Sequence, residues 1–253
     1  MGILGFGRRK EDTPPGFTPG RVGYAVGDIH GRADLLTRMF DRLEQDVRPV
    51  GEAPPVVVFL GDYVDRGPDS AEVIDLLLTG RPEGFERRFL KGNHEAAMLA
   101  FLEDPIANRA WLSHGGLETL ASYNVRPLPS LGATAAEVGE TGAAFRACLP
   151  ASHRSFLEAL ERYVVLGDYC FVHAGVDPAR KLDAQSDTDL FWIRARFLED
   201  QRRLPYTIVH GHTPIAAPYQ DKRRIGLDTG AYFSGVLSAA RFSGAAVEFL
   251  NVR

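Results

Sequence analysis

The first hundred residues repeat one order of elements three times: a strand, a short polar loop and a helix. The expected strands cover residues 22–26, 55–60 and 87–90, and helical patterns follow at residues 33–47, 70–78 and 95–103. In the first helical stretch the apolar residues recur at the three-and-four spacing of an amphipathic helix: Leu35, Leu36, Met39, Phe40 and Leu43. Because strand–helix–strand units have right-handed crossovers, we expect an α/β fold with these strands parallel and ending at one edge of a sheet.

Each of the three predicted strands ends in a polar loop. The loops read GDIHG, GDYVDRG and KGNHE, and they contain Asp28, His30, Asp62 and Asn93. An aspartate and a histidine between glycines can be turn residues that bond only to the backbone, so one such loop alone decides little. In open α/β sheets, however, ligands bind in the crevice at the carboxyl ends of the strands. Three such loops at one edge therefore predict a ligand site.

The second half of the chain contains an insertion and then more strands. Residues 105–163 have a mostly helical pattern without a catalytic motif, and we expect them to form a lid or cap. Further strand patterns with glycine-containing turns predict a second, largely antiparallel sheet: residues 162–169, 169–176, 206–214, 223–231, 235–242 and 245–252. Two of these strands end in histidines, which adds imidazoles to the candidate site.

Composition limits the partners and the compartment. The 253 residues are 45% hydrophobic and 25% charged with a net charge of -4, and the lack of an overall basic field argues against a nucleic-acid partner. No apolar run is long enough to span a membrane. Cys148 and Cys170 form no paired motif, so we expect reduced packing residues in a cytoplasmic protein. The Gly- and Pro-rich residues 1–20 predict a flexible tail before a single domain over residues 21–253.

Five of the seven histidines stand in short glycine-flanked motifs at predicted strand ends. With the carboxylates and the asparagine of the loops, they provide a candidate ligand set: Asp28, His30, Asp62, Asn93, His173 and His212. Carboxylate, amide and imidazole donors without thiolates suit Mn²⁺, Fe or Zn²⁺ rather than a structural zinc knot. Two metal ions that share one bridging carboxylate would use all six residues.

These motifs, in this order and with these gaps, resemble those of one protein family. DIHG, GDYVDRG, GNHE, HAG and HGHTP are similar to motifs of the calcineurin-like metallophosphoesterases, in the phosphoprotein phosphatase branch of serine/threonine phosphatases. The similarity spans about residues 22 to 253, and FWIR and WLSHGGLETLASY also resemble segments of small bacterial and phage phosphatases. The resemblance implies a four-layer αββα sandwich of two mixed sheets, with a dimetal site at the strand ends and a helical insertion.

The resemblance also implies a role for each ligand. Asp28 and His30 would bind the first metal ion, and Asp62 would bridge both ions. The second ion would be held by Asn93, His173 and His212. We expect two divalent ions, Mn²⁺ first, with Fe, Zn or Ni as alternatives. The wider superfamily often has a further histidine where this chain has Pro214, so the first ion would complete its shell with water.

The acid and the phosphate contacts are implied in the same way. A water bridging the ions would attack in line, and His94, oriented by Asp65, would protonate the departing oxygen. Arg66 and Arg194 would clamp the phosphate, because a guanidinium offers two parallel donors. Arg66 could instead be a structural ion-pair partner. Arg196 is so near to Arg194 that FWIRARF could present either side chain.

Three histidines receive no role in this interpretation. His210 lies within HGHTP, where a structural hydrogen bond and a phosphate contact both stay open. His114 and His153 fall in the insertion, where we expect surface positions.

The leading functional interpretation is a metal-dependent phosphomonoester hydrolase that acts as a serine/threonine protein phosphatase on phosphorylated protein or peptide. The alternative is a symmetrical dinucleoside tetraphosphate hydrolase, in which the insertion would form a nucleotide pocket. A catalytically inactive binding module would lack a ligand or the acid, and none is missing. The aromatic residues of the insertion have a spacing that suits helix cores more than a stacking platform, which favours the phosphoprotein: Trp111, Tyr123, Phe145, Phe156 and Tyr163.

Overall fold

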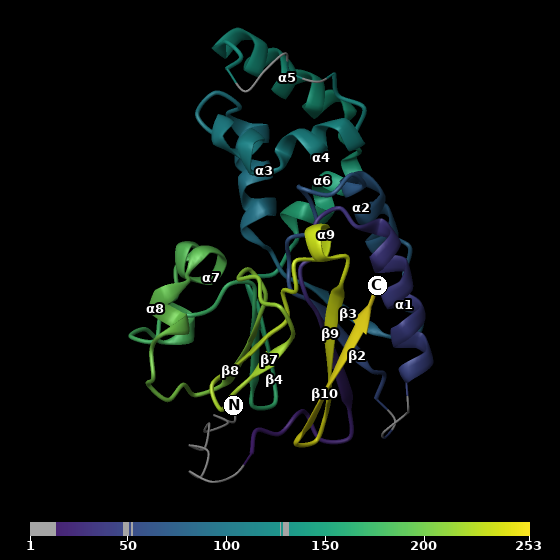
Figure 1. Cartoon of the computed structure of the whole chain (residues 1–253), viewed down its shortest axis with the longest axis vertical. Coiled ribbons are helices and arrows are strands. Elements are labelled where there is room, and N and C mark those ends of the chain that lie inside the picture. The colour runs from purple at the N-terminus through teal and green to yellow at the C-terminus, as the bar shows by residue number, and fades with distance from the viewer. Residues whose placement is uncertain (1–13, 48–50, 52, 127, 129–131) are drawn as a thin grey trace, which may run out of the picture.

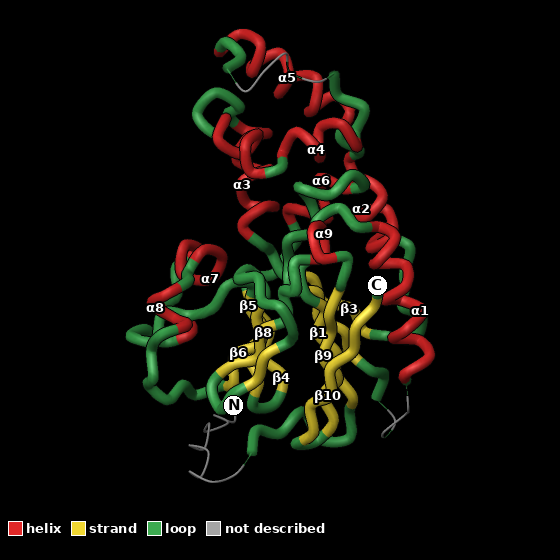
Figure 2. The backbone as a smooth tube through the Cα atoms, in the orientation of Figure 1, coloured by secondary structure: helices red, strands yellow, loops and turns green. Residues whose placement is uncertain are grey.

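Two five-stranded sheets pack face to face in the middle of the molecule, and helices cover both outer faces (Figures 1 and 2). The structure is a computed structural model, and it describes residues 14–47, 51, 53–126, 128 and 132–253. Within these residues, no helix combines the length and the apolar character needed to cross a lipid bilayer.

The first sheet has the strand order β10-β9-β1-β2-β3. Its three parallel strands are β1 (Val22–Val26), β2 (Val56–Phe59) and β3 (Glu86–Phe89). Two antiparallel strands, β9 (Leu237–Ser243) and β10 (Ala246–Val252), extend the sheet on the side of β1. The three parallel strands confirm the repeat predicted from the sequence, and their carboxyl ends lie at one edge.

The second sheet has the order β4-β5-β6-β8-β7 and is mixed. Its central strands β5 (Tyr169–Val172), β6 (Thr207–His210) and β8 (Arg224–Gly226) are parallel. The edge strands β4 (Tyr163–Leu166) and β7 (Tyr219–Gln220) run antiparallel to their neighbours. A mixed sheet agrees with the fold that the family resemblance implied, and it corrects the largely antiparallel sheet expected from the strand pattern.

The last two strands belong to the first sheet and not to the second, which corrects the expected grouping. β1 is buried along its whole length, so its backbone needs a hydrogen-bonded partner on each side. β2 provides one partner, and β9 provides the other through pairs that run from Val22 with Ser243 to Val26 with Ala239. An apolar pattern shows that a strand is buried, but it does not show which strand lies beside it.

Three apolar clusters fill the spaces between the layers. On the outer face of the first sheet lie α1 (Ala33–Asp46) and α2 (Ser70–Leu78). Between the sheets, side chains of both inner faces pack together, among them Ala25, Val58, Phe171 and Val209. The outer face of the second sheet is covered by α7 (Asp187–Trp192) and α8 (Ala195–Leu198). These layers confirm the αββα sandwich.

The insertion forms a helical layer at one end of the sandwich, at the top of Figure 1. α3 (Asn93–Glu103) leads into it, and it contains η1 (Arg109–His114), α4 (Gly116–Ser122), α5 (Ala135–Cys148) and α6 (Ala151–Glu158). Its aromatic rings pack on one another: the ring centroids of Trp111 and Phe145 are 5.8 Å apart, and those of Tyr123 and Phe145 are 5.5 Å apart. As the spacing predicted, these three rings form a core. Two further short helices are η2 (Leu182–Ala184) and α9 (Ala231–Ser234).

Residues 14–20 are attached to the sandwich. Phe17 is 3% exposed, and its ring centroid lies 5.8 Å from that of Phe242. The backbone N–H of Phe17 donates a hydrogen bond of 2.7 Å to the carbonyl oxygen of Gly244. This packing corrects the end of the expected tail, because the packed chain begins before residue 21. The rest of that tail, residues 1–13, lies outside the described residues.

The burial of three side chains can be compared with the burial that the sequence predicted. Cys170 is buried as predicted, but Cys148 is exposed. His153 is buried rather than on the surface, because one ring nitrogen lies 2.8 Å from the hydroxyl of Tyr123 and the other 2.9 Å from a carboxylate oxygen of Asp75. Such partners come from other helices, so a helical pattern does not reveal them.

Candidate metal centre

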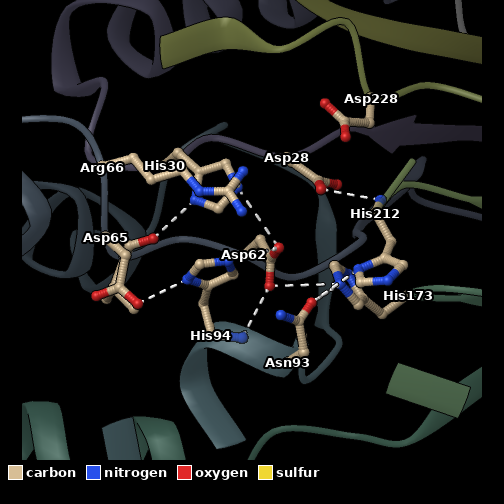
Figure 3. A network of polar contacts seen from close by, with 12 residues as sticks. Asp28, His30, Asp62, Asp65, Arg66, Asn93, His94, His173, His212 and Asp228 are labelled. Atoms are coloured by element: carbon tan, nitrogen blue, oxygen red, sulfur yellow. Dashed lines mark hydrogen bonds and ion pairs between the residues drawn. The ribbon is translucent and has the colours of Figure 1, made fainter. Parts of the chain in front are cut away.

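The polar loops at the strand ends bring their side chains together into one network of contacts (Figure 3). Three loops of the first sheet and two of the second contribute the predicted ligands, although these are up to 184 residues apart, as in the contact between Asp28 and His212. All six predicted ligands are buried there: Asp28, His30, Asp62, Asn93, His173 and His212. The structure therefore brings together the whole predicted set.

Asp62 lies between two groups of potential ligands. Its Oδ2 atom is 3.5 Å from Nε2 of His30, and its Oδ1 atom is 3.4 Å from Nε2 of His173. Two triads each have ligand atoms within 4.8 Å of one another: His30, Asp62 and His94 form one, and Asp62, His173 and His212 form the other. Asp62 is the shared member, which agrees with its predicted role as a bridge.

Two imidazoles of the second triad lie close to the side-chain oxygen of Asn93. Nδ1 of His173 donates to the carbonyl oxygen of Leu60 at 2.9 Å, which places the proton of a neutral imidazole on Nδ1. Nε2 of His173 therefore presents a lone pair, and it lies 2.9 Å from Oδ1 of Asn93. Nδ1 of His212 lies 2.8 Å from the same oxygen, and its buried Nε2 has no hydrogen-bond partner among the described residues. The facing electron-pair donors, Nε2 of His173 and Oδ1 of Asn93, and the unpartnered Nε2 of His212 fit a metal ion.

The first group has a similar arrangement. Nδ1 of His30 donates to the carbonyl oxygen of Val64 at 2.9 Å, which leaves its Nε2 atom facing Asp62. Oδ2 of Asp28 accepts a hydrogen bond of 2.9 Å from the backbone N–H of His212. Oδ1 of Asp28 is buried and has no partner among the described residues. Asp28 belongs to neither triad, so its predicted role as a ligand rests on this free oxygen.

The protonation states also suit cations. Burial lowers the pKa of His30 to about 3 and that of His212 to about 2, so both imidazoles are neutral near pH 7. Burial alone would raise the pKa of Asp62, but the surrounding histidines hold it below its usual value. Burial, and then the charge of Asp228, raise the pKa of Asp28 well above its usual value. Buried carboxylates with neutral imidazoles need a positive charge, and two divalent ions would supply it. Sequence reasoning did not identify Asp228.

The loops hold the backbone of the ligands in an uncommon conformation. The φ angles of His30, Asp62 and His212 are 48°, 51° and 62°, a region that few residues other than glycine adopt. Glycines also make room for ligand side chains: a Cβ atom at Gly92 would lie 2.1 Å from Oδ1 of Asp62, and one at Gly211 would lie 1.9 Å from Oδ1 of Asp28. Such strained positions cluster at functional sites.

His94, a member of the first triad, forms a hydrogen-bonded pair with Asp65. Nδ1 of His94 lies 2.6 Å from Oδ2 of Asp65, and Nε2 lies 3.9 Å from Oδ2 of Asp62. Burial alone would lower the pKa of His94, but Asp62 and Asp65 raise it above its usual value. The imidazolium therefore persists toward neutral pH, as a general acid requires. The pair lies where it was predicted, and its role stays a prediction.

Glu95 supports the site, although sequence reasoning gave it no role. Its buried carboxylate accepts hydrogen bonds from the backbone N–H groups of Asp62, Tyr63 and Gly92 at 2.9, 2.7 and 2.9 Å. Burial, and then the charge of Asp62, raise the pKa of Glu95 to about 7. Glu95 thus fixes the loop that presents Asp62. The signal in the sequence is its place in GNHE, directly after His94.

The insertion reaches the site, although its sequence shows no catalytic motif. Nε1 of Trp111 donates to Oδ2 of Asp65 at 2.8 Å, and Oγ1 of Thr119 donates to Oδ1 at 2.6 Å. The backbone N–H of Arg66 donates to the carbonyl oxygen of Gly115 at 3.2 Å. All three insertion residues come from the segment WLSHGGLETLASY, which therefore connects the insertion to the loop after β2.

The two arginines expected to bind phosphate lie at different ligand groups. Nη1 of Arg66 is 3.2 Å from Nε2 of His30. The charge of Arg194 contributes to the low pKa of His212, after burial and other charges, which places it near the second triad. Arg196 instead forms an ion pair of 2.8 Å with Asp177. Of the two side chains in FWIRARF, Arg194 is therefore the one near the site.

His210 has structural partners. Its Nδ1 atom lies 2.9 Å from the carbonyl oxygen of Gly211, and its ring centroid lies 5.3 Å from that of Phe197. It belongs to neither ligand triad. Of the two alternatives left open by the sequence, these contacts favour the structural one.

Two exposed aromatic rings stand against the ligands, and both come from outside the insertion. Trp192, at the end of α7, is 46% exposed, and its ring centroid lies 6.4 Å from that of His212. Tyr232, in α9, is 37% exposed, and its ring centroid lies 5.4 Å from that of His30. Each ligand group thus has an aromatic side chain beside it. Sequence reasoning looked for aromatic residues only in the insertion and missed both.

Comparison with known proteins assigns the chain to a family. The model of the calcineurin-like phosphoesterases matches residues 24–236, which include all the predicted ligands. The chain belongs to the calcineurin-like phosphoesterases. This confirms the family resemblance of the motifs and identifies a phosphoesterase with a site suited to metal ions.

Curated relatives within this family of phosphoesterases match most of the chain. The asymmetrical bis(5'-nucleosyl)-tetraphosphatase PrpE of Bacillus subtilis strain 168 is 29% identical over 236 residues, which cover 86% of this chain and 89% of the relative. PrpE of Halalkalibacterium halodurans is 25% identical over 248 residues, which cover 90% and 92%.

Solved structures share the fold of this phosphoesterase. A candidate diadenosine tetraphosphatase has a TM-score of 0.63 and 21% identity, covering 95% of this chain and 99% of that one. A protein serine/threonine phosphatase from Saccharomyces cerevisiae has a TM-score of 0.55 and 16% identity, covering 95% and 84%. At these identities the similarity extends to the fold alone.

Proposed function

We propose that this phosphoesterase hydrolyses a phosphoanhydride bond of dinucleoside tetraphosphates at a centre of two divalent metal ions. The observation that carries the proposal is the pair of exposed rings, Trp192 beside His212 and Tyr232 beside His30. Nucleobases stack on aromatic side chains, and a dinucleotide has one base for each side of the centre. The names of the PrpE relatives support the same substrate class.

The metal ions would be held by the six buried ligands described above, with Asp62 between them. Bound there, two divalent ions supply positive charge for the phosphate oxygens and a water of lowered pKa as nucleophile. Oxygen and nitrogen donors make Mn²⁺ our first proposal, with Fe, Zn or Ni as alternatives. The cytoplasmic location inferred from the free cysteines belongs to the same proposal.

The side chains around the ions orient the substrate and move one proton. Arg66 and Arg194 bind phosphate oxygens on the sides of His30 and His212. Nε2 of His94 donates a proton to the departing oxygen, while Asp65 holds Nδ1 of the same ring. A nucleotide leaves as a phosphate, which is a much weaker base than an alkoxide. We therefore expect His94 to matter less for an anhydride than for an alkyl ester.

The products distinguish two modes of cleavage. The PrpE relatives are named asymmetrical, so we propose cleavage of diadenosine tetraphosphate to one triphosphate and one monophosphate. Symmetrical cleavage, which was the alternative in the sequence analysis, would give two diphosphates instead. Chromatography of the nucleotides formed by the purified protein separates the two.

A phosphoprotein is the second candidate, and one observation favours it. Trp111, Tyr123 and Phe145 of the insertion pack on one another, so the insertion offers no stack of free rings to a base. The deciding experiment compares kcat/KM for diadenosine tetraphosphate and for a panel of phosphoserine, phosphothreonine and phosphotyrosine peptides, with added Mn²⁺. We expect the dinucleotide to exceed the best peptide at least about a hundredfold, as differences of about 3 kcal/mol between substrates require. A peptide with the higher value would reverse the order.

A further inference from the structure

A pocket of about 500 Å³ lies beside the first ligand group. Arg66 and Tyr232 line it on the side of the metal centre, and a segment of the insertion lines it on the other side: Leu112, Ser113, His114, Gly115, Leu117 and Glu118. Because Arg66 and Tyr232 also contact His30, the pocket lies next to the centre. Its volume is within the range of about 300–1,000 Å³ that small-molecule sites occupy.

The lining of this pocket differs from one end to the other. The guanidinium of Arg66 stands at the end near His30 and suits a phosphate group. The ring of Tyr232 provides apolar surface, and Leu112 and Leu117 provide more. Three exposed polar side chains complete the lining: Ser113, His114 and Glu118. A ligand with a phosphate, a flat apolar body and several hydroxyl or amino groups matches this order, and a nucleotide is such a ligand.

The insertion wall of the pocket is fixed to the catalytic loop. Gly115 accepts the backbone hydrogen bond of Arg66 at 3.2 Å, and the neighbouring residues Trp111 and Thr119 donate to Asp65. The wall and the metal centre therefore keep one relative position. A pocket held in this way binds without the cost of ordering a loop.

We propose that this pocket, between Tyr232 and residues 112–118, binds one nucleoside of a dinucleoside polyphosphate. The inference rests on the proposed function, and it assigns one of the two bases of the dinucleotide to this pocket. The base packs between the ring of Tyr232 and Leu117, and the first phosphate lies at Arg66. The guanidinium carbon of Arg66 lies 5.0 Å from the centroid of the Tyr232 ring. A phosphate group that binds Arg66 moves this guanidinium away from the ring of Tyr232, and the base then stacks on the exposed ring.

The test compares two substrates in two variants of the metal-loaded protein. Tyr232→Ala removes the stacking ring, and Leu117→Trp fills the pocket without touching His30. We expect the ratio of kcat/KM for diadenosine tetraphosphate to that for p-nitrophenyl phosphate to fall about 10- to 100-fold in each, as the loss of one stacked base predicts. Tyr232→Phe keeps the ring and should keep the wild-type ratio. Tyr219→Ala removes an exposed ring on the edge strand β7 and serves as the matched control.

Each outcome decides between the pocket and the alternatives. An unchanged ratio in Leu117→Trp, in a protein that cleaves the dinucleotide, overturns the pocket and leaves the proposed function intact. If the wild type does not cleave the dinucleotide, the proposed function fails, and calorimetry with adenosine monophosphate then tests the pocket alone. Binding that Leu117→Trp weakens at least tenfold supports the pocket, and absent binding overturns it. If the variants instead lower the ratio of kcat/KM for phosphopeptides to that for p-nitrophenyl phosphate, the pocket binds a peptide chain. That result overturns the assignment of the pocket to a nucleoside.

Discussion

Nε1 of Trp111 donates a hydrogen bond of 2.8 Å to Oδ2 of Asp65, the same oxygen that lies 2.6 Å from Nδ1 of His94. Thr119 donates to the other oxygen at 2.6 Å. Burial raises the pKa of Asp65, and the hydrogen bonds from His94, Thr119 and Trp111 act against that rise. The insertion thus helps to keep this carboxylate ionised, and an ionised Asp65 holds the ring of His94 in place and raises its pKa.

Replacing Trp111 by Phe should slow the reaction in a way that depends on the leaving group. The variant keeps an aromatic ring between Phe101 and Phe145 but loses the N–H donor to Asp65. For alkyl phosphates, which need protonation of the departing oxygen, we expect kcat to fall about 3- to 30-fold, a part of the 10²–10⁴ that general acids contribute. For dinitrophenyl phosphate, kcat should change little, because the dinitrophenolate group departs without being protonated. Phe145→Leu disturbs the same packing and keeps the indole, so it serves as the control. Equal losses for both esters would mean that Trp111 acts through packing alone.

Substitution of His94 and Asp62 should separate proton transfer from metal binding. Asp62 is shared by both ligand triads, so Asp62→Asn should reduce the metal content at both positions, measured by inductively coupled plasma spectrometry. His94→Asn should keep the metal and lower kcat for an alkyl phosphate by about 10²–10⁴. The triad of His94 with His30 and Asp62 allows a different role. Loss of one metal ion per chain in His94→Asn would identify His94 as a ligand.

The positions of ligand loops could be predicted from the sequence where a motif directly follows a predicted strand. The loops that contain Asp28, Asp62 and Asn93 follow three strands of one repeat, so their meeting at one edge follows from the handedness of the crossovers. His173 and His212 follow parallel strands of the other sheet, and their glycine-flanked motifs made them candidates before the family resemblance gave them a role. Which strands pair over long distances in the sequence was not predictable. β9 pairs with β1 across more than 200 residues, and an apolar pattern does not show which strand is the partner.

The residues missed around the site have their roles through contacts and not through residue type. Trp111 and Thr119 lie in helices of the insertion and act on Asp65 from 46 and 54 residues away. Trp192 and Tyr232 look like ordinary apolar residues of short helices, and only their exposure beside His212 and His30 distinguishes them. Burial and neighbourhood decide such roles, and both are properties of the fold.

The two cysteines should react at very different rates with a thiol reagent. Cys148 is exposed at the end of α5, whereas Cys170 is fully buried in β5, and burial raises the pKa of its thiol to about 12. Since the thiolate is the reactive form, we expect dithionitrobenzoate to modify one thiol per native chain and a second only after unfolding in guanidinium chloride. Cys148→Ser should abolish the fast phase. Two fast thiols in the native protein would contradict the position of Cys170 in the sheet.

The stability of the metal-free protein should depend on pH through Asp228. Burial raises the pKa of Asp228 to about 6 in the folded protein, compared with about 3.9 in an unfolded chain. Between these two values the folded state binds more protons, so the stability contributed by Asp228 is fully present below about pH 4 and is lost as the pH rises to about 6. The buried histidines act in the opposite direction because their pKa values are lowered. The informative quantity is therefore the difference in free energy of unfolding between the wild type and Asp228→Asn.

That difference can be measured by urea unfolding of metal-depleted protein between pH 4 and pH 7. Asp228→Asn should gain stability relative to the wild type as the pH rises through this window, and above about pH 6 the gain should level off. Saturating Mn²⁺ should reduce the gain, because cations at the site offset the negative charge that Asp28 and Asp228 share. A difference that does not change between pH 4 and pH 6 would mean that Asp228 has an ordinary pKa, and the uncompensated negative charge would then have to lie on Asp28 alone.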